Sequence, residues 1–268
     1  MPLEQLIDML ENNTNTLVRP SKWEDPYEQL IRISKIKLDD SQEKEIQHLE
    51  WKRWYGQCWS YVYESDSLWR AFTKGKNVRC VKITTSYGKL KNSLKSSPKQ
   101  NQRPVVPFLE DVTYINDYQD EFEKSFCKHT KTFIKSIILP DNAKDDKISE
   151  YYINHSFVFS LLQTKRKAFE HESEIRLLAF EEGDVEEYDK DSVYQYEVNP
   201  TELIDKIEFD PWTPPHLRKS YLKLMEKYGF VNENDKEIVS FSKLYDKPSK
   251  GIVIHISNTE IITHGNRP

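Results

Sequence analysis

The sequence has 268 residues, of which 39 are Lys or Arg and 44 are Asp or Glu, giving a net charge of -5. The 15 Tyr, 12 Phe and 6 Trp residues exclude an extensively disordered chain, because disordered segments are poor in aromatic side chains. Charges of both signs are interspersed, so the sequence offers no obvious surface for duplex nucleic acid. Only seven glycines are present and no two lie close together, which excludes the dinucleotide-binding fingerprint and the P-loop.

The three cysteines are scattered and provide neither a disulfide framework nor a zinc site, so we expect reduced thiols and no metal. The N-terminal segment MPLEQLIDMLENN lacks the basic start and apolar run of a signal peptide. No apolar run is long enough to cross a membrane. The sequence therefore predicts a cytoplasmic protein without membrane contact.

The first part of the sequence predicts short helices and strands in alternation. Apolar residues at helical spacing indicate a helix at 3–12, and TNTLVRP indicates a strand that ends at Pro20. Asp25 is expected to cap a helix that begins near Pro26. The elements expected next are a helix at 42–54, a strand at 55–63, a short helix capped by Ser65 or Asp66 that ends before Gly75, and a strand at 77–85.

Residues 96–107 contain three prolines and no apolar period, so a loop or an insertion is expected there. The later expected elements are a strand at 109–115, helices at 117–139 and about 148–169, strands near 191–197, 205–209, 237–241 and 251–263, and a helix near 215–228. Helices and strands mix without a regular βαβ rhythm. The predicted fold class is therefore α+β, with a mixed, largely antiparallel sheet and flanking helices in a single domain spanning 1–268.

The stretch KRKAFEHESEIRLLAF, residues 165–180, places charged side chains at the expected junction of a helix and a strand. In a strand, Glu172, Glu174 and Arg176 point to the same side. Two adjacent carboxylates repel each other unless a cation, a ligand or water relieves them, and Arg176, Lys165 or Arg166 supplies such a cation. The pattern fits two interpretations equally well, a structural ion-pair network or a glutamate pair that lines a cleft.

Three tryptophans stand in compact motifs. Trp23 of WEDPYE, Trp59 of CWS and Trp69 of SDSLWR are expected to be largely buried and close to one another, because the segments that carry them otherwise lack a common core. Cys58, beside Trp59, would need a His partner to act as a nucleophile, and no His has a diagnostic spacing from it.

Taken together, the motifs W-x-D-P-x-E, C-W-S, S-D-S-L-W-R and K-R-x-x-F-x-x-E-x-E-x-R resemble a bacterial family, the domain of unknown function 2971. The resemblance extends from about Leu17 to Phe180, with weaker similarity in IDKIEFDPW and SFSKLY further on. Members of that family often have a short strand just upstream of the first helix, whereas this sequence begins within that helix. The resemblance implies a family and no particular reaction.

A more remote similarity suggests NAD as a substrate. ADP-ribosyltransferases bind NAD on a glycine-poor split sheet, and many present an Arg, a Ser and an E-x-E motif on successive strands. The sequence has Arg19, Ser60 and then Glu172 and Glu174 in that order. The resemblance implies that Glu174 stabilises the positive charge that builds on the ribose and that Glu172 positions the attacking group. The residues then expected to contact NAD are Arg19, Ser60, Trp69, Arg70, Lys165 and Arg176.

The leading hypothesis is an NAD-using, ADP-ribosyltransferase-like bacterial enzyme, such as a toxin or a phage-defence effector, with a macromolecular target that the sequence does not identify. The first alternative is a non-catalytic ligand-binding or protein-interaction module whose aromatic side chains form a recognition groove. The second is a metal-dependent nuclease, although Glu174-Ile175-Arg176 has Arg where an E-x-K pattern has Lys. The NAD hypothesis requires Arg19, Ser60 and Glu174 to line one pocket.

Overall fold

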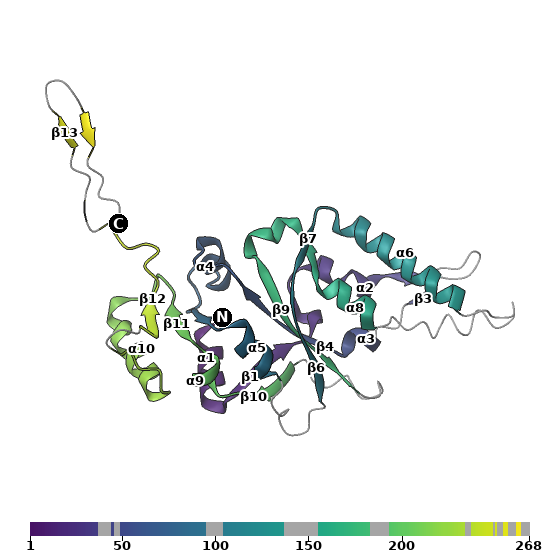
Figure 1. Ribbon diagram of the computed structural model, residues 1–268, viewed down its shortest axis with the longest axis horizontal. Helices are drawn as coiled ribbons and strands as arrows, with labels where there is room; N and C mark the ends of the chain where they lie inside the picture. Colours follow the sequence, from purple (N-terminus) through teal and green to yellow (C-terminus); the bar gives the residue numbers. More distant parts are fainter. Residues whose placement is uncertain are drawn as a thin grey trace.

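The protein is an α+β structure with helices on both faces of a largely antiparallel main sheet, as the sequence predicts (Figure 1). The computed structural model describes residues 1–36, 44–45, 49–94, 104–136, 155–182, 193–233, 237–248, 250, 254–256 and 261–263.

The main sheet has five strands in the order β10-β1-β4-β9-β6, and all neighbouring strands are antiparallel. Its strands are β1 (Thr14–Val18), β4 (Trp54–Ser60), β6 (Val105–Asp111), β9 (Glu174–Glu181) and β10 (Val193–Glu197). β4 and β9 pair along their length, from Trp54 opposite Phe180 to Ser60 opposite Glu174. This pairing fixes the position of the predicted glutamate motif relative to Ser60.

The join between β1 and β4 is much weaker. A single residue pair, Val18 opposite Gly56, links the two strands through the backbone. Beyond that pair the side-chain amides of Asn15 and Gln57 bond each other reciprocally, at 3.2 Å and 3.0 Å. The main sheet therefore has two parts, β10-β1 and β4-β9-β6, joined at one seam. A two-part sheet of this kind does not by itself identify an ADP-ribosyltransferase fold.

A second sheet contains β5 (Val81–Thr84), β11 (Lys206–Phe209) and β12 (Val239–Phe241). β11 lies between the other two strands, antiparallel to β5 and parallel to β12. The remaining strands form two-stranded pairs: parallel β7 (Thr113–Ile115) with β8 (Thr164–Arg166), and antiparallel β2 (Lys35–Ile36) with β3 (Lys44–Glu45) and β13 (Ile254–Ile256) with β14 (Ile261–Thr263).

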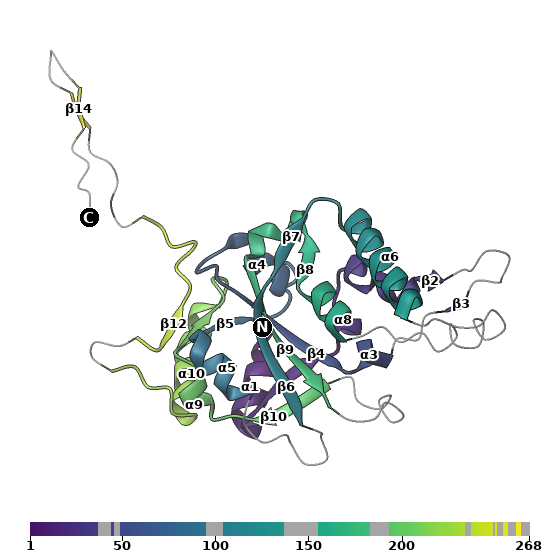
Figure 2. The same cartoon turned by 45° about the vertical axis from the view of Figure 1, so that its right-hand side comes forward.

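Two apolar cores cover the two faces of the main sheet, because side chains alternate between faces along each strand. On one face, Tyr55 and Leu177 pack with α1 (Leu3–Asn12), α5 (Tyr87–Ser93), α9 (Pro200–Leu203) and α10 (Pro215–Lys227). On the other face, Trp54 and Leu178 pack with α2 (Leu30–Ile33), α3 (Leu49–Lys52), α6 (Tyr118–Ser136) and α8 (His155–Leu162). Figure 2 shows the second group of helices together beside β4 and β6.

Several predicted elements and caps are confirmed. The helix at 3–12 is α1, and the later helix at 215–228 is α10. Asp25 accepts a hydrogen bond from the amide of Tyr27, although the segment that it caps is a 3-10 helix, η2 (Pro26–Gln29). Ser65 caps α4 (Asp66–Phe72) by accepting a bond from the Leu68 amide. The strands predicted near 191–197, 205–209 and 237–241 are β10, β11 and β12.

Other predictions are wrong. The helix expected at 42–54 is only the short α3, because Trp54 already pairs in β4 and β3 precedes it. Part of the loop expected at 96–107 belongs to β6, which begins at Val105 and includes Pro107; residues 96–103 lie outside the described residues. The strand expected at 251–263 is the β13–β14 hairpin. The helix expected at about 148–169 ends with α8 at Leu162, because the chain re-enters strand structure in β8; residues 148–154 lie outside the described residues.

The three motif tryptophans do not form one cluster. Trp69 is buried and Trp23 and Trp59 are half-buried, so none points fully into solvent. Trp23 packs with the core that contains Trp54, whereas Trp59 packs with the core that contains Tyr55. The predicted common tryptophan core is therefore wrong, because these two side chains lie on opposite faces of the main sheet.

The close approach of Trp23 to Gly56 yields a stability prediction. A Cβ added to Gly56 would lie 2.7 Å from the Trp23 ring and 3.0 Å from the Leu178 side chain. We expect Gly56→Ala to lower the free energy of unfolding in urea by about 1–3 kcal/mol, the usual cost of overpacking. The matched control is Gly88→Ala in α5, where an added Cβ meets nothing within 4 Å. Equal stabilities of the two variants would contradict the prediction.

Candidate ion-pair site and aromatic face

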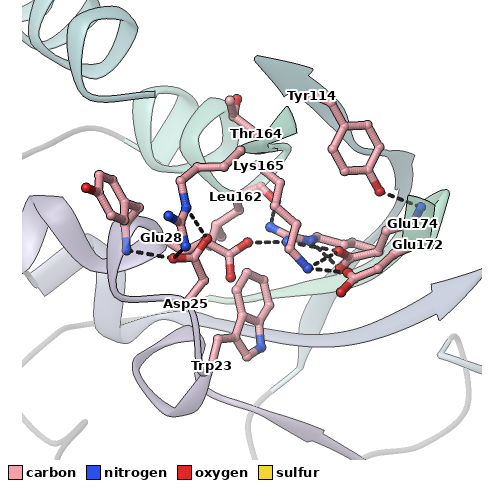
Figure 3. Close-up of polar contacts among 12 residues, drawn as sticks. Trp23, Asp25, Glu28, Tyr114, Leu162, Thr164, Lys165, Glu172 and Glu174 are labelled. Carbon is pink, nitrogen blue, oxygen red and sulfur yellow. Dashed lines mark hydrogen bonds and ion pairs between the residues drawn. The ribbon is translucent and has the colours of Figure 1, made fainter. Parts of the chain in front are cut away.

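Arg176 is the centre of a buried polar cluster on β9. Figure 3 shows its partners Glu28, Leu162 and Glu174. Its Nε donates to Glu174 Oε1 at 2.8 Å, and its Nη1 donates to the carbonyl of Leu162 at 2.6 Å. Its Nη2 donates to Glu28 Oε1 and, at 3.3 Å, to Glu174 Oε2. The ring of Trp23 lies 4.3 Å from the guanidinium carbon. One buried cation therefore connects η2, the end of α8 and β9.

Lys165 on β8 bridges the two glutamates of the E-x-E motif. Its Nζ donates to Glu172 Oε2 at 2.5 Å and to Glu174 Oε2 at 2.9 Å. Both oxygens of Glu174 thus accept bonds from cations, and its side chain is only 3% exposed. Glu172 differs, because its side chain is 25% exposed and lies at the edge of the cluster.

A second ion pair and three aromatic rings complete the surroundings. Arg166 binds Asp25 through two parallel bonds, Nη2 to Oδ1 at 2.9 Å and Nε to Oδ2 at 3.1 Å. This bidentate geometry is the most favourable for an Arg–carboxylate pair. The Tyr27 ring lies 4.2 Å from the Arg166 guanidinium, and the Phe169 ring lies 4.8 Å from the Lys165 ammonium. Each of the three cations is therefore in contact with an aromatic face.

The local backbone explains how the motif reaches this geometry, and it corrects one prediction. Lys167–Glu172 form a 3-10 helix, η4, and Ser173 has a left-handed conformation with φ of 44°. β9 therefore begins only at Glu174, so Glu172 does not share a strand face with Glu174 and Arg176. The amide of Glu174 donates to the Tyr114 hydroxyl at 2.8 Å. The turn at Ser173 still returns the Glu172 carboxylate to Lys165.

The cluster strongly changes the acidity of Glu174. Burial alone would raise the pKa of this carboxyl, but the charge and hydrogen bonds of Arg176, and then Lys165, lower the pKa to about 2. The same interactions raise the pKa of Lys165 in spite of its burial. Glu174 is therefore ionised throughout the neutral pH range, and its charge is fully compensated within the protein.

Cys58 lies beside this cluster and is a poor candidate for a nucleophile. The residue is solvent-exposed, yet crowding by protein atoms desolvates its thiol, and this effect raises the pKa of the thiol well above its ordinary value. Arg176 opposes the rise, and Glu174 adds to it. Because the thiolate is the reactive form, the Cys58 thiol is protonated and unreactive at neutral pH.

The residues predicted to contact NAD do not all meet in one place, although Lys165 and Arg176 both bind Glu174. Ser60 lies next to the glutamates, and its Oγ donates to the Glu172 carbonyl at 2.5 Å. Arg19, by contrast, donates to the Tyr55 hydroxyl at 3.0 Å and lies 4.7 Å from the Tyr55 ring. Tyr55 faces the other core and precedes Ser60 by five residues on β4, a separation of roughly 16 Å. Arg19, Ser60 and Glu174 therefore do not line one pocket.

The other two predicted contacts, Trp69 and Arg70, belong to α4. Trp69 is buried and donates through Nε1 to Glu64 at 2.5 Å. Arg70 is exposed, pairs with Asp66 at 2.9 Å and donates to the Tyr245 hydroxyl at 3.0 Å. Among the described residues, neither side chain bonds to Glu172 or Glu174. Trp69 and Arg70 thus form a different surface from the ion-pair cluster.

Trp212 and Tyr245 lie beside Arg70, and sequence reasoning did not select either of them. Arg70 and Lys76 lie over the Trp212 ring at 5.6 Å and 5.0 Å, and the Tyr245 ring centroid is 5.4 Å from that of Trp212. Trp212 ends the weak motif IDKIEFDPW, and Tyr245 ends SFSKLY. Those two motifs were the available signal, since they bring aromatic residues from distant parts of the chain to α4.

The same surface extends to Tyr63. Lys82 lies over the Tyr63 ring at 4.5 Å and pairs with Glu208 at 2.8 Å. Asp210 directly follows β11 and accepts the Trp212 amide at 2.9 Å. We define the α4 face as these exposed or half-buried side chains on one side of the second sheet: Tyr63, Arg70, Lys74, Lys76, Trp212 and Tyr245.

Metal-binding groups and membrane-spanning helices bear on the functional alternatives. No group of three or more His, Cys, Asp or Glu side chains in this part of the chain could hold a metal ion. The described helices include none that is both long and apolar enough to cross a membrane. The carboxylates of the E-x-E motif are instead bound to Lys165 and Arg176, which gives no support to the nuclease alternative.

The fold and site define a class, an α+β protein in which a buried ion-pair cluster anchors one end of the main sheet. Residues 68–177 match the family model described as Protein of unknown function (DUF2971). The resemblance predicted from the motifs is thereby confirmed. No curated protein and no solved structure matched the chain, so the comparisons name no reaction.

The lowered pKa of Glu174 predicts how stability depends on pH. Its folded-state value of about 2 lies below the ordinary 4.5, so the unfolded chain binds the proton first as pH falls. Wild-type protein should therefore lose roughly 3 kcal/mol between about pH 5 and pH 2, a contribution that is fully present at higher pH. Glu174→Gln should be less stable at pH 7 and should lack this loss.

The measurement is urea unfolding of both proteins from pH 7 to the lowest pH at which they fold. Glu170→Gln is the matched control, because Glu170 is an exposed glutamate of η4. We expect the control to stay within about 0.5 kcal/mol of wild type. Parallel pH profiles for wild type and Glu174→Gln would contradict the assignment of Glu174 as a buried ion-pair partner.

Proposed function

We propose that this protein is a non-catalytic binding module that holds an anionic partner on the α4 face. The observation that carries the proposal is the exposure of fixed aromatic rings beside cations: Tyr63 is 73% exposed and has Lys82 over its ring, and Tyr245 is 47% exposed and bonds Arg70. Exposed aromatic groups of this kind mark interaction surfaces. A partner that used both ring faces and ammonium groups would carry negative charge.

The ion-pair cluster has a supporting role in this proposal. A catalytic carboxylate must contact the developing charge of the substrate, whereas both oxygens of Glu174 are bound to Arg176 and Lys165 within the protein. Leaving Arg176 unpaired in the interior would be strongly destabilising. These observations favour the structural interpretation of the E-x-E motif over its use as a catalytic pair.

The proposal predicts a charge-dependent interaction that local substitutions remove. Wild-type protein should be retained on immobilised heparin, a polyanion, at low salt, and the double variant Lys74→Glu, Lys76→Glu should elute earlier because two cations of the α4 face are reversed. Lys219→Glu with Lys223→Glu is the matched control, since both residues are exposed on α10 and the net charge changes equally. Equal elution of the two double variants would reject the α4 face as the binding surface.

Glycosyl transfer from NAD is the second candidate function. One observation favours it: Ser60 and the two glutamates lie at the same end of β4 and β9, and Glu172 is partly accessible. In an NAD enzyme of this type, Glu174→Gln would remove turnover far more than NAD binding, because the ribosyl charge develops only in the transition state.

We expect the opposite result from the ion-pair geometry. Wild-type protein should not consume NAD in the presence of cell extract as a source of targets, and Glu174→Gln should lower the melting temperature. The two measurements are NAD consumption and thermal unfolding of the same preparations. The enzymatic alternative would be established, and the binding module rejected, by two results together. Wild-type protein would consume NAD, and Glu174→Gln would be as stable as wild type but inactive.

A further inference from the structure

We infer that the anionic partner of the α4 face is a single-stranded nucleic acid, DNA or RNA, whose bases stack on exposed rings while its phosphates meet Lys74 and Lys76. This inference rests on the proposed binding function and specifies its partner. Proteins that bind single strands combine aromatic stacking platforms with cations that follow the phosphates. The α4 face presents both kinds of group on one side of the second sheet.

The rings of this face are held in place before any partner binds. The Tyr245 hydroxyl donates to Asp66 and accepts from Arg70 Nη2. The Tyr63 ring has Lys82 over one face, and the same ammonium donates to the Tyr63 carbonyl at 2.6 Å. These contacts fix each ring while leaving much of its surface accessible. Such preorganisation reduces the entropy that a partner must lose on binding.

The cations of the α4 face differ in whether they are free to bind a phosphate group. Its acidic neighbours are already engaged: Asp66 with Arg70, Glu208 with Lys82, and buried Asp210 with Arg79 at 3.6 Å. Within the described part of the chain Lys74 has no ion pair, and Lys76 lies over the Trp212 ring with a weaker electrostatic interaction with Asp66. The two lysines are therefore the cations that remain available for phosphate groups.

The loop that carries these lysines adopts an unusual backbone. Lys74, Gly75 and Lys76 all have positive φ, at 46°, 66° and 79°. Residues with a Cβ rarely adopt this region, so an Asn or a Gly would be the easier choice at either position. Buried Thr73 holds the loop, because its carbonyl accepts the Val78 amide and its Oγ1 accepts the Lys76 amide. The fold thus fixes two lysines where their backbone is unfavourable.

Single strands fit this face better than either alternative polyanion. In a duplex the bases are stacked on each other and cannot reach a protein ring, and the interspersed charges of both signs give no basic stripe for a duplex backbone. An acidic peptide would use the lysines but would make little use of the faces of Tyr63 and Tyr245. Bases and phosphates together use every group of the face.

The test measures the fluorescence anisotropy of labelled 12-nucleotide DNA and RNA strands with the full protein over a salt series. We expect both strands to bind more tightly than a duplex of the same sequence. Tyr63→Leu should weaken binding at least about fivefold, since base stacking contributes that much per ring. Lys74→Ala with Lys76→Ala should reduce the slope of log affinity against log salt by about 1.4, the value for two single-strand phosphate contacts.

Tyr228→Leu is the matched aromatic control, because Tyr228 likewise has a lysine over its ring but lies at the end of α10. Thermal unfolding of each variant separates loss of binding from loss of folding. Duplex binding as tight as single-strand binding, or no effect of Tyr63→Leu, would overturn the inference. The inference would also be overturned if a polyglutamate peptide displaced the labelled strand and Tyr63→Leu had no effect on binding. That result would identify an acidic protein segment as the partner.

The inference and the proposed function can fail separately. Loss of heparin retention in the lysine-to-glutamate variant, without binding of any strand, would reject the nucleic acid and retain the α4 face as an anion-binding surface. Heparin retention that does not depend on Lys74 and Lys76 would reject the binding surface itself.

Discussion

The buried guanidinium of Arg176 is the constraint on which one end of this structure depends. Removing a charge from water is costly, and the cost is met only if its donors find acceptors in good geometry. Glu174, Glu28 and the Leu162 carbonyl provide those acceptors from three different segments. The chain must therefore bring η2, the end of α8 and β9 together before Arg176 is buried at an acceptable free energy. The W-x-D-P-x-E and E-x-E-x-R motifs are two parts of one interaction.

The residues that form the site could be predicted from the sequence better than their arrangement in space. The residues 165–176 were correctly identified as a concentration of charge, because alternating Glu and Arg before an apolar strand is unusual. The partner Glu28 is not among the predicted site residues, since its distance of 148 residues from Arg176 leaves no local signal. The prediction that Arg19 lies beside Ser60 and Glu174 also lacked a local signal. The order of residues along the chain does not determine which face of a sheet each one occupies.

The errors in secondary structure have a common physical cause. Residues 42–54 and 163–169 carry polar residues and helix formers, so local propensity favours helix. Tertiary pairing overrides that preference where Trp54 pairs with Phe180 in β4 and where Lys165 pairs with Tyr114 in β8. The elements predicted correctly, such as α1 and α10, are those in which the apolar residues follow the helical period closely and pack as whole faces on the sheets.

The seam between β1 and β4 has a consequence for how the molecule yields under load. Seven residue pairs join β4 to β9, whereas one joins β4 to β1. A force that pulls the chain apart across the sheet would meet a ladder of backbone bonds on one side of β4 and little more than the Asn15–Gln57 amide pair on the other. The sheet would separate first between β1 and β4. This would release β1 and β10, while β4, β9 and β6, anchored by Arg176, stay together.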